Sequence, residues 1–273
     1  MFLFCLIKVK EFEFLIFSLV FLISQKDLSA IMNLIFSAMY GIYSYPVHLE
    51  KEGLTIDITE NNGIYRYVRN CCGEKYECLI SSPGEKIHVN PVEPVNLPKY
   101  ITKYLEIDFE RVLVSPESNI MYYLTFPIEI GVFLESKKNL EPLDLFSLQP
   151  AKYSLYGDPT NGEIVKYYKS YLRRDLPEVD ILKEGVLSIT IINSDSTIAS
   201  VSKLVFDSYG MKVYYNENLV SMVAQMKIYQ KNIAETEFLN VPLLVGMEKS
   251  AELYTTRNIP AIKRYYLMER GFD

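Results

Sequence analysis

Histidine is scarce in this sequence, with only His48 and His88 in 273 residues. General acid–base catalysis and metal binding both rely heavily on histidine, so this supply is thin for either role. The sequence also lacks a glycine-rich phosphate loop and a serine nucleophile elbow. These absences favour a non-enzymatic protein, and they indicate no cofactor.

Cysteine is scarce as well. Cys71, Cys72 and Cys78 form an odd set after residue 38, and no Asn-x-Ser/Thr glycosylation acceptor occurs, which favours a reduced, cytoplasmic setting. These three thiols and His88 are together four potential ligands for a zinc ion. However, the side chains of adjacent Cys71 and Cys72 are expected to point apart on a strand. We therefore predict small apolar contacts at a hairpin end and no metal site.

Glycine, proline and tyrosine are absent from residues 1–38, whereas all 12 Gly, 13 Pro and 22 Tyr lie at or after Met39. The first 38 residues are dominated by Phe, Leu, Ile and Lys, as in translated AT-rich DNA. Their uncharged run, residues 14–24, is shorter than the roughly 20 apolar residues that span a bilayer. We predict a non-core apolar extension over residues 1–38, explained most simply by a start codon assigned too far upstream. A surface-lying membrane anchor and an extra packed element are the alternatives.

The charge balance is mildly acidic, with a formal net charge of −6. Residues 1–38 carry three lysines and three acidic residues, so the remainder keeps the same net charge. An acidic globule is a poor generic partner for nucleic acid. We therefore expect no nucleic-acid partner, and membrane contact only through residues 1–38.

Alternating apolar and polar residues, the pattern of half-buried strands, recur after Met39. Leu54, Ile56 and Ile58 alternate with polar residues, and Asn62-Gly63 then favours a tight hairpin turn. A second hairpin is predicted to turn at residues 72–74. Roughly ten such segments predict an all-β or β-dominated fold, an antiparallel β-sandwich of one or two packed units with little helix.

Two β halves are predicted, over residues 39–150 and 151–273. Pro91, Pro94 and Pro98 indicate a stiff connector within the first half, because proline fixes φ and donates no ladder hydrogen bond. Residues 163–174 fit both a helical face and a strand. Residues 261–269 predict a short C-terminal helix.

Two segments are typical of a known family: Tyr122–Val132 (YYLTFPIEIGV) and Lys152–Pro159 (KYSLYGDP). With the opening Met39-Tyr40-Gly41, they resemble an uncharacterised archaeal family, domain of unknown function 432. The similarity runs from about residue 39 to about residue 240. The resemblance implies an archaeal origin and a family start near Met39, and it implies no activity.

The segment Gly157–Arg174 holds the candidate ligand residues. Residues 157–162 combine Asp-Pro with Asn-Gly and predict a double turn with Asp158 as a hydrogen-bond acceptor. A basic and aromatic run follows, of a kind that can hold phosphates while stacking on bases or sugars, and residues 263–266 repeat its composition. If a ligand site lies here, we expect a deep pocket near Gly157 whose titratable side chains have shifted pKa values. The candidates are Asp158, Lys166, Lys169, Arg173 and Arg174.

Three acidic residues alternate along one strand, at Glu106, Asp108 and Glu110. Carboxylates so placed could serve glycoside chemistry or bind calcium. A solvated sheet face explains them more simply, so we predict that they face solvent.

The preferred functional prediction is a non-enzymatic β-sandwich module that binds a protein partner or assembles with itself, because tyrosine suits amphipathic contact surfaces. One alternative is a sugar- or nucleotide-binding protein or enzyme with its site near Gly157–Arg174. Another is a membrane-tethered accessory protein, which depends on residues 1–38.

Overall fold

The computed structural model describes residues 38–81, 84, 86–99, 101–137, 139–253 and 265–272. Strands dominate this part of the chain, which contains β1 to β19 and one short 3-10 helix, η1 (Ser208–Gly210). The predicted β-dominated fold is therefore confirmed.

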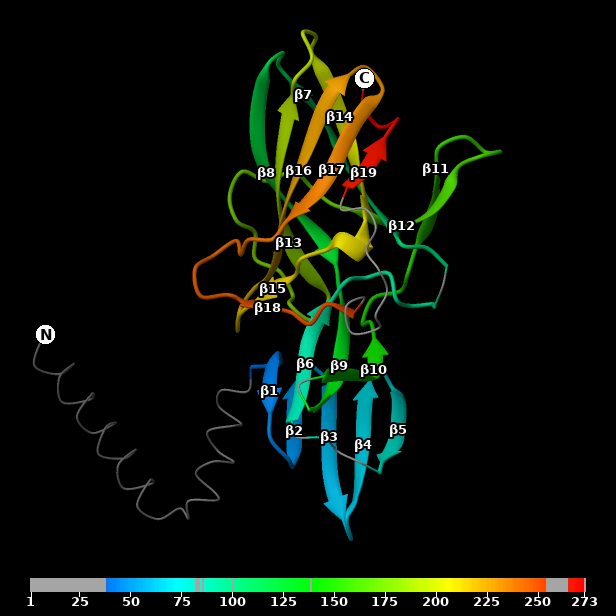
Figure 1. The fold of residues 1–273 in the computed structure, drawn as a ribbon, viewed down its shortest axis with the longest axis vertical. Helices are drawn as coiled ribbons and strands as arrows, with labels where there is room; N and C mark the ends of the chain where they lie inside the picture. The colour runs from blue at the N-terminus through cyan, green and yellow to red at the C-terminus, as the bar shows by residue number, and fades with distance from the viewer. Residues whose placement is uncertain are drawn as a thin grey trace, which may run out of the picture.

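Two antiparallel four-stranded sheets form one end of the elongated molecule (Figure 1). The first follows chain order: β2 (Val47–Lys51), β3 (Leu54–Asn61), β4 (Ile64–Cys71) and β5 (Glu74–Ile80). The second has the order β1 (Gly41–Tyr43), β6 (Lys86–Val92), β9 (Glu129–Ser136) and β10 (Asn139–Phe146).

Two mixed sheets form the other end (Figure 1). One has the order β11 (Tyr153–Tyr156), β12 (Glu163–Lys169), β7 (Tyr104–Val114) and β14 (Ala199–Asp207). The other has the order β18 (Glu248–Lys249), β15 (Tyr214–Tyr215), β16 (Val220–Gln230), β13 (Glu184–Asn193) and β8 (Ser118–Pro127). To it are added β17 (Ile233–Leu239), which pairs with β16, and β19 (Tyr265–Met268), which pairs with β17. Most pairs are antiparallel, as predicted, but β12 runs parallel to β7 and β13 runs parallel to β16.

Local turn chemistry explains the two predicted hairpins. Asn62 and Gly63 have φ values of 53° and 77°, and Cys72 and Gly73 have φ values of 53° and 81°. Two consecutive positive φ angles define the turn type that matches the twist of a two-residue hairpin. Both predicted hairpins, β3–β4 and β4–β5, are confirmed.

A continuous hydrophobic core joins the two ends of the molecule. It contains Leu49 and Tyr67 from the β2–β5 sheet together with Ile189 and Phe206 from the mixed sheets. Strands from before and after residue 150 also share sheets, because β7 pairs with β12 and β14 while β8 pairs with β13. The division predicted near residue 150 thus does not follow a sheet boundary.

The C-terminal helix predicted over residues 261–269 is wrong for residues 265–268, which form strand β19. Exposure alternates along it, with Tyr265 and Leu267 exposed and Met268 buried, which is the two-residue period of a strand. Residues 261–264 lie outside the described residues. The ambiguous segment 163–174 begins with strand β12.

The predicted proline connector begins later than expected, because Pro91 lies inside β6 opposite Ile130 of β9. Strand β1 pairs with β6 only as far as Val89, so β6 has a single neighbour at Pro91. A missing backbone N–H is tolerated where a strand has an open side.

Residues 1–37 lie outside the described residues, and with them most of the predicted apolar extension. Within the part of the chain that the structure describes, no helix has the length and hydropathy needed to cross a membrane.

Replacing Gly185 by alanine should destabilise the fold. A Cβ atom on Gly185 would lie 2.5 Å from Cζ of Phe126 and 3.1 Å from the carbonyl oxygen of Val220. Both neighbours are fully buried, so they cannot move aside without strain. We expect the free energy of unfolding, measured by urea denaturation, to fall by about 1–3 kcal/mol. The double variant Gly185→Ala/Phe126→Leu should recover part of this loss, and wild-type stability of Gly185→Ala would contradict the packing.

Candidate ligand-binding site

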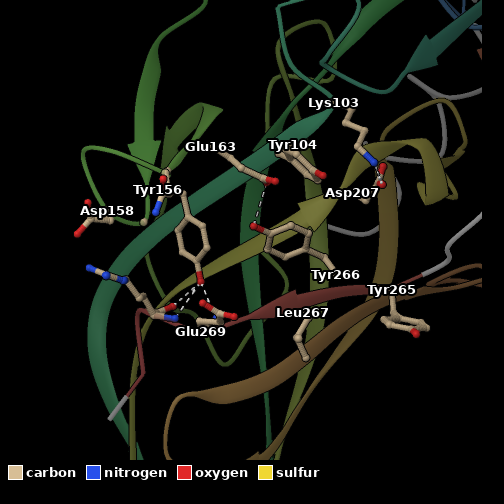
Figure 2. A pocket seen from close by; sticks show the side chains of 14 residues that line it. Lys103, Tyr104, Tyr156, Asp158, Glu163, Asp207, Tyr265, Tyr266, Leu267 and Glu269 are labelled. Atoms are coloured by element: carbon tan, nitrogen blue, oxygen red, sulfur yellow. Dashed lines mark hydrogen bonds and ion pairs between the residues drawn. The ribbon is translucent and has the colours of Figure 1, made fainter.

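A cavity of about 510 Å³ lies between the β11–β12 hairpin, the start of β7, the end of β14 and the C-terminal strand β19 (Figure 2). Four elements far apart in the sequence therefore build its walls. Its lining consists mainly of tyrosine and charged side chains: Lys103, Tyr104, Tyr156, Asp158, Glu163, Asp207, Tyr265, Tyr266, Glu269 and Arg270, with Gly157, Asn161, Gly162 and Leu267.

Three tyrosine rings, those of Tyr104, Tyr156 and Tyr266, form an aromatic cluster in this cavity. We call the cavity the tyrosine pocket. The Tyr266 ring lies between the other two, with its centroid 5.0 Å from that of Tyr104 and 6.0 Å from that of Tyr156. Figure 2 shows the rings of Tyr156 and Tyr266 side by side. Such inclined pairs are favourable arrangements of aromatic rings, and each ring keeps an apolar face and a polar hydroxyl group.

Tyr156 fastens the C-terminal segment to the cavity wall. Its hydroxyl donates to the Arg270 carbonyl oxygen at 2.9 Å and accepts from the backbone N–H groups of Glu269 at 3.1 Å and Arg270 at 3.0 Å. Burial raises the pKa of Tyr156, although the two backbone donors partly oppose that shift. The hydroxyl therefore stays protonated at neutral pH and serves as both donor and acceptor.

The Tyr156→Phe variant should loosen the C-terminal segment. It removes one donor and leaves the two backbone N–H groups of Glu269 and Arg270 without this acceptor. We expect the free energy of unfolding to fall by about 1–3 kcal/mol. Amide hydrogen exchange should accelerate at Glu269 and Arg270 more than at the β3–β4 pair. Unchanged exchange at these two amides would contradict the role given to Tyr156.

Tyr266 is tied to the β12 strand through Glu163. The Tyr266 hydroxyl donates to Oε2 of Glu163 at 3.3 Å, as Figure 2 shows. Burial raises the pKa of Tyr266 well above its usual range, and the Glu163 carboxylate raises it further. Tyr266 is thus a neutral hydrogen-bond donor under all physiological conditions.

Carboxylates outnumber cations around the cavity. Lys103 already has partners within the protein, since its ammonium lies 2.6 Å from Oδ2 of Asp207 and 4.8 Å from the Tyr104 ring centroid. Asp158 accepts hydrogen bonds from the N–H and hydroxyl of Thr160, and these lower its pKa. The four carboxylates are Asp158, Glu163, Asp207 and Glu269, and the two cations are Lys103 and Arg270. This excess of negative charge disfavours phosphate-bearing ligands.

A smaller cavity of about 220 Å³ lies beside the far end of β12 and is lined in part by Lys152, Lys166 and Lys169. Lys166 is buried, and its ammonium lies 3.0 Å from Oε1 of Glu129. Its charge is therefore balanced inside the protein by the Glu129 carboxylate.

The five residues predicted as ligand contacts do not share one cavity. Asp158 lines the larger cavity, and Lys166 and Lys169 line the smaller one. Arg173 is exposed and pairs through its backbone with Tyr123 of β8, while Arg174 is exposed. Neither arginine lines either cavity.

Glu106 corrects the prediction of a solvated acidic face. It is 2% exposed, and Oε1 accepts from the Lys203 ammonium at 3.1 Å. Oε2 has no hydrogen-bond partner in the described part of the chain. The C-terminal segment packs closely on this face, since a Cβ on Gly271 would lie 2.1 Å from Cγ of Lys203. Glu110 does remain exposed, as expected.

The sequence alone missed most of the tyrosine pocket. Tyr104, Glu163 and Glu269 belong to no motif, and the only signal at Tyr266 is the basic and aromatic composition of residues 263–266. The Gly157 turn was the useful signal, since the predicted pocket near Gly157 does occur and contains tyrosines with raised pKa values.

The prediction that Cys71 and Cys72 point apart is wrong, because their sulfur atoms lie 3.3 Å apart. Cys72 is not on the strand but in the hairpin turn, where its positive φ of 53° redirects the side chain. Among the described residues, no group of three or more His, Cys, Asp or Glu side chains is placed to hold a metal ion.

Comparison with known proteins identifies one family. The model of the family described as a protein of unknown function (DUF432) matches residues 39–269, which extends the resemblance beyond residue 240. Searches of curated proteins and of solved structures found no match. The family model covers most of the chain, and the chain therefore belongs to the DUF432 family.

Proposed function

We propose that this protein is a non-enzymatic binding protein whose tyrosine pocket takes a neutral, polyhydroxylated small molecule such as a mono- or disaccharide. The observation that supports this most is the combination of three clustered tyrosine rings and four carboxylates around one cavity. Its volume of about 510 Å³ suits a small molecule.

The chemistry of the lining favours hydroxyl groups as ligand groups. Carboxylate oxygens such as those of Glu163 and Glu269 are strong acceptors for O–H donors, because hydrogen bonds to a charged acceptor are short and strong. The apolar faces of tyrosine rings suit the C–H faces of a sugar ring. A nucleotide has the opposite charge requirement, since its phosphates would meet an excess of negative charge.

A ligand screen tests this proposal. Saturation-transfer NMR of the full chain with neutral mono- and disaccharides should show binding of at least one of them, and AMP and ATP should show none at the same concentrations. Nucleotide binding without saccharide binding would overturn the proposal, and so would no binding of either class.

Self-association through the β11 edge is the second candidate function. Strand β11 is the outer strand of its sheet, in a hairpin that projects from the body (Figure 1). Tyr153, Leu155 and Ile164 are 37%, 48% and 53% exposed on this hairpin. The outer strands β5 and β10 carry protective residues, Lys75 and Pro142, whereas β11 has neither charge nor proline. An unprotected edge is suited to pairing with another strand.

Sedimentation velocity tests the second candidate. The wild-type chain should form dimers at micromolar concentration, and the variant Leu155→Lys/Ile164→Lys should be a monomer with unchanged thermal stability. A wild-type chain that stays monomeric would remove this candidate without affecting the tyrosine pocket.

We also propose a reducing, cytoplasmic setting, which the free thiols of Cys71, Cys72 and Cys78 support. A membrane-tethered role would rest on residues 1–38 alone, and residues 1–37 lie outside the described residues.

A further inference from the structure

The β4–β5 hairpin turn places two adjacent thiols in contact. The sulfur atoms of Cys71 and Cys72 lie 3.3 Å apart, and neither cysteine is in a disulfide. Cys71 is buried at the end of β4, whereas Cys72 is exposed in the turn. The pair therefore combines an exposed cysteine with a buried cysteine whose sulfur is in contact with it.

Backbone geometry explains why these thiols meet. On a regular strand, successive side chains project to opposite faces. Here Cys72 has a φ of 53° and Gly73 a φ of 81°, and the two residues form the tight turn that joins Asn70–Cys71 to Glu74–Lys75. The left-handed conformation of Cys72 brings its side chain back toward Cys71. Asn62 has the same φ of 53° in the β3–β4 turn, so this conformation belongs to the hairpin and not to the cysteine.

We propose that Cys71 and Cys72 form a redox-active dithiol, which a small-molecule disulfide oxidises reversibly to a vicinal disulfide. This inference does not depend on the tyrosine pocket. It assigns a modification site to the β4–β5 turn and identifies the reacting partner by chemical class.

The reaction is an ordinary thiol–disulfide exchange in two steps. The Cys72 thiolate attacks one sulfur of the small disulfide, forms a mixed disulfide and releases one thiolate, which takes up a proton as a thiol. Cys71 then loses its proton and attacks the Cys72 sulfur, which releases the second thiol. The protein loses two hydrogen atoms in total, and the small disulfide is reduced to two thiols.

The order of attack follows from exposure. Burial raises the pKa of the Cys71 thiol to about 11, and the neighbouring Cys72 adds to this shift. The exposed Cys72 is therefore the residue that meets the oxidant, and Cys71 resolves the mixed disulfide. The sulfur atoms must still approach from 3.3 Å to the roughly 2.05 Å of a disulfide bond. Because Cys72 is exposed, reducing thiols can reach this disulfide and reduce it again, as is typical of regulatory rather than structural disulfides.

Peptide mass spectrometry tests this proposal on the full chain. Cleavage after Arg69 and Lys75 yields the peptide Asn70–Lys75, which contains both thiols and no other cysteine. Reduced protein is exposed to oxidised glutathione, quenched with an alkylating reagent and digested. We expect this peptide to appear two hydrogen atoms lighter and without an alkyl group, and dithiothreitol should reverse the change.

Two variants separate this pair from the other cysteines. Cys78→Ser should keep the two-hydrogen loss in peptide 70–75, because Cys78 takes no part. Cys72→Ser replaces an exposed side chain and should leave Cys71 alkylated after denaturation, with no two-hydrogen loss. The proposal is overturned if the wild-type peptide stays a dialkylated dithiol, carries glutathione on both cysteines, or becomes cross-linked to the peptide that contains Cys78.

Discussion

Replacing Lys166 by methionine should lower the free energy of unfolding by about 3–5 kcal/mol, because it leaves a buried carboxylate without its cation. Glu129 is fully buried, and its Oε1 lies 3.0 Å from the Lys166 ammonium. The backbone N–H groups of Asn96 and Leu97 donate to the same carboxylate, each at 3.2 Å. These two donors cannot neutralise its charge, so most of the loss should remain. Urea denaturation at pH 7 measures it.

The matched control is Glu129→Gln/Lys166→Met, which removes both charges and keeps an acceptor for the Leu97 N–H. It should recover most of the lost stability, since a neutral pair of similar volume carries no unpaired charge. Wild-type stability of Lys166→Met, or no recovery in the double variant, would contradict this account of the ion pair.

The pH dependence of Lys166→Met follows from Glu129. Burial already raises the pKa of Glu129 in the wild type, against the lowering effect of Lys166, and the variant loses that opposing effect. A folded-state pKa above the unfolded value means that the folded state binds the proton more tightly, so stability falls as pH rises from the unfolded pKa, about 4.3, through the folded one. The stability gap between Lys166→Met and the double variant should therefore shrink as pH is lowered from 7 toward 4.3. A stability gap between the two variants that does not change with pH would contradict the role of Glu129.

Replacing Tyr266 by alanine should weaken saccharide binding at least about tenfold, or about 1.4 kcal/mol. Tyr266 is the central ring of the tyrosine pocket, and its hydroxyl orients Glu163. The variant removes an aromatic face of the pocket, and it also removes the hydrogen bond that holds the Glu163 carboxylate in place. Isothermal titration calorimetry with the saccharide that binds best to the wild type measures the loss.

Two further variants control the Tyr266 result. Tyr266→Phe keeps the ring and removes only the hydrogen bond to Glu163, so its effect should be smaller than that of alanine. Tyr171→Ala removes a tyrosine that is 57% exposed and does not line the pocket, and it should bind as the wild type does. Equal weakening by Tyr171→Ala and Tyr266→Ala would contradict the placement of the site.

The parts of the fold that depend on neighbouring residues could be predicted. The turns at Asn62-Gly63 and Cys72-Gly73 follow from the residues in them, and the alternation of Leu54, Ile56 and Ile58 marks a buried strand face. Sheet order could not be predicted in this way. The parallel register of β7 with β12, which sets Glu106 opposite Tyr167, joins residues about 60 positions apart and depends on how the whole chain packs.

In the candidate site too, local features could be predicted from the sequence and long-range contacts could not. The turn at Gly157 and the acceptor role of Asp158 are local, and both were predictable. Tyr266 reaches the pocket only because β19 pairs with β17, where Thr236 lies opposite Tyr266. The sequence predicts a helix around Tyr266, so it does not reveal which way the Tyr266 side chain points. Burial of Glu106 was missed for a related reason, since its cover comes from Lys203 and the C-terminal segment.

NMR spectroscopy of the chain with ¹³C-labelled tyrosine rings tests the central claim most directly. On titration with neutral mono- and disaccharides, the ring signals of Tyr104, Tyr156 and Tyr266 should shift in a saturable way, and those of Tyr171 and Tyr229 should stay in place. Saccharide-induced shifts confined to tyrosines outside the pocket, or no shift with any saccharide, would contradict the claim that this cavity is the binding site.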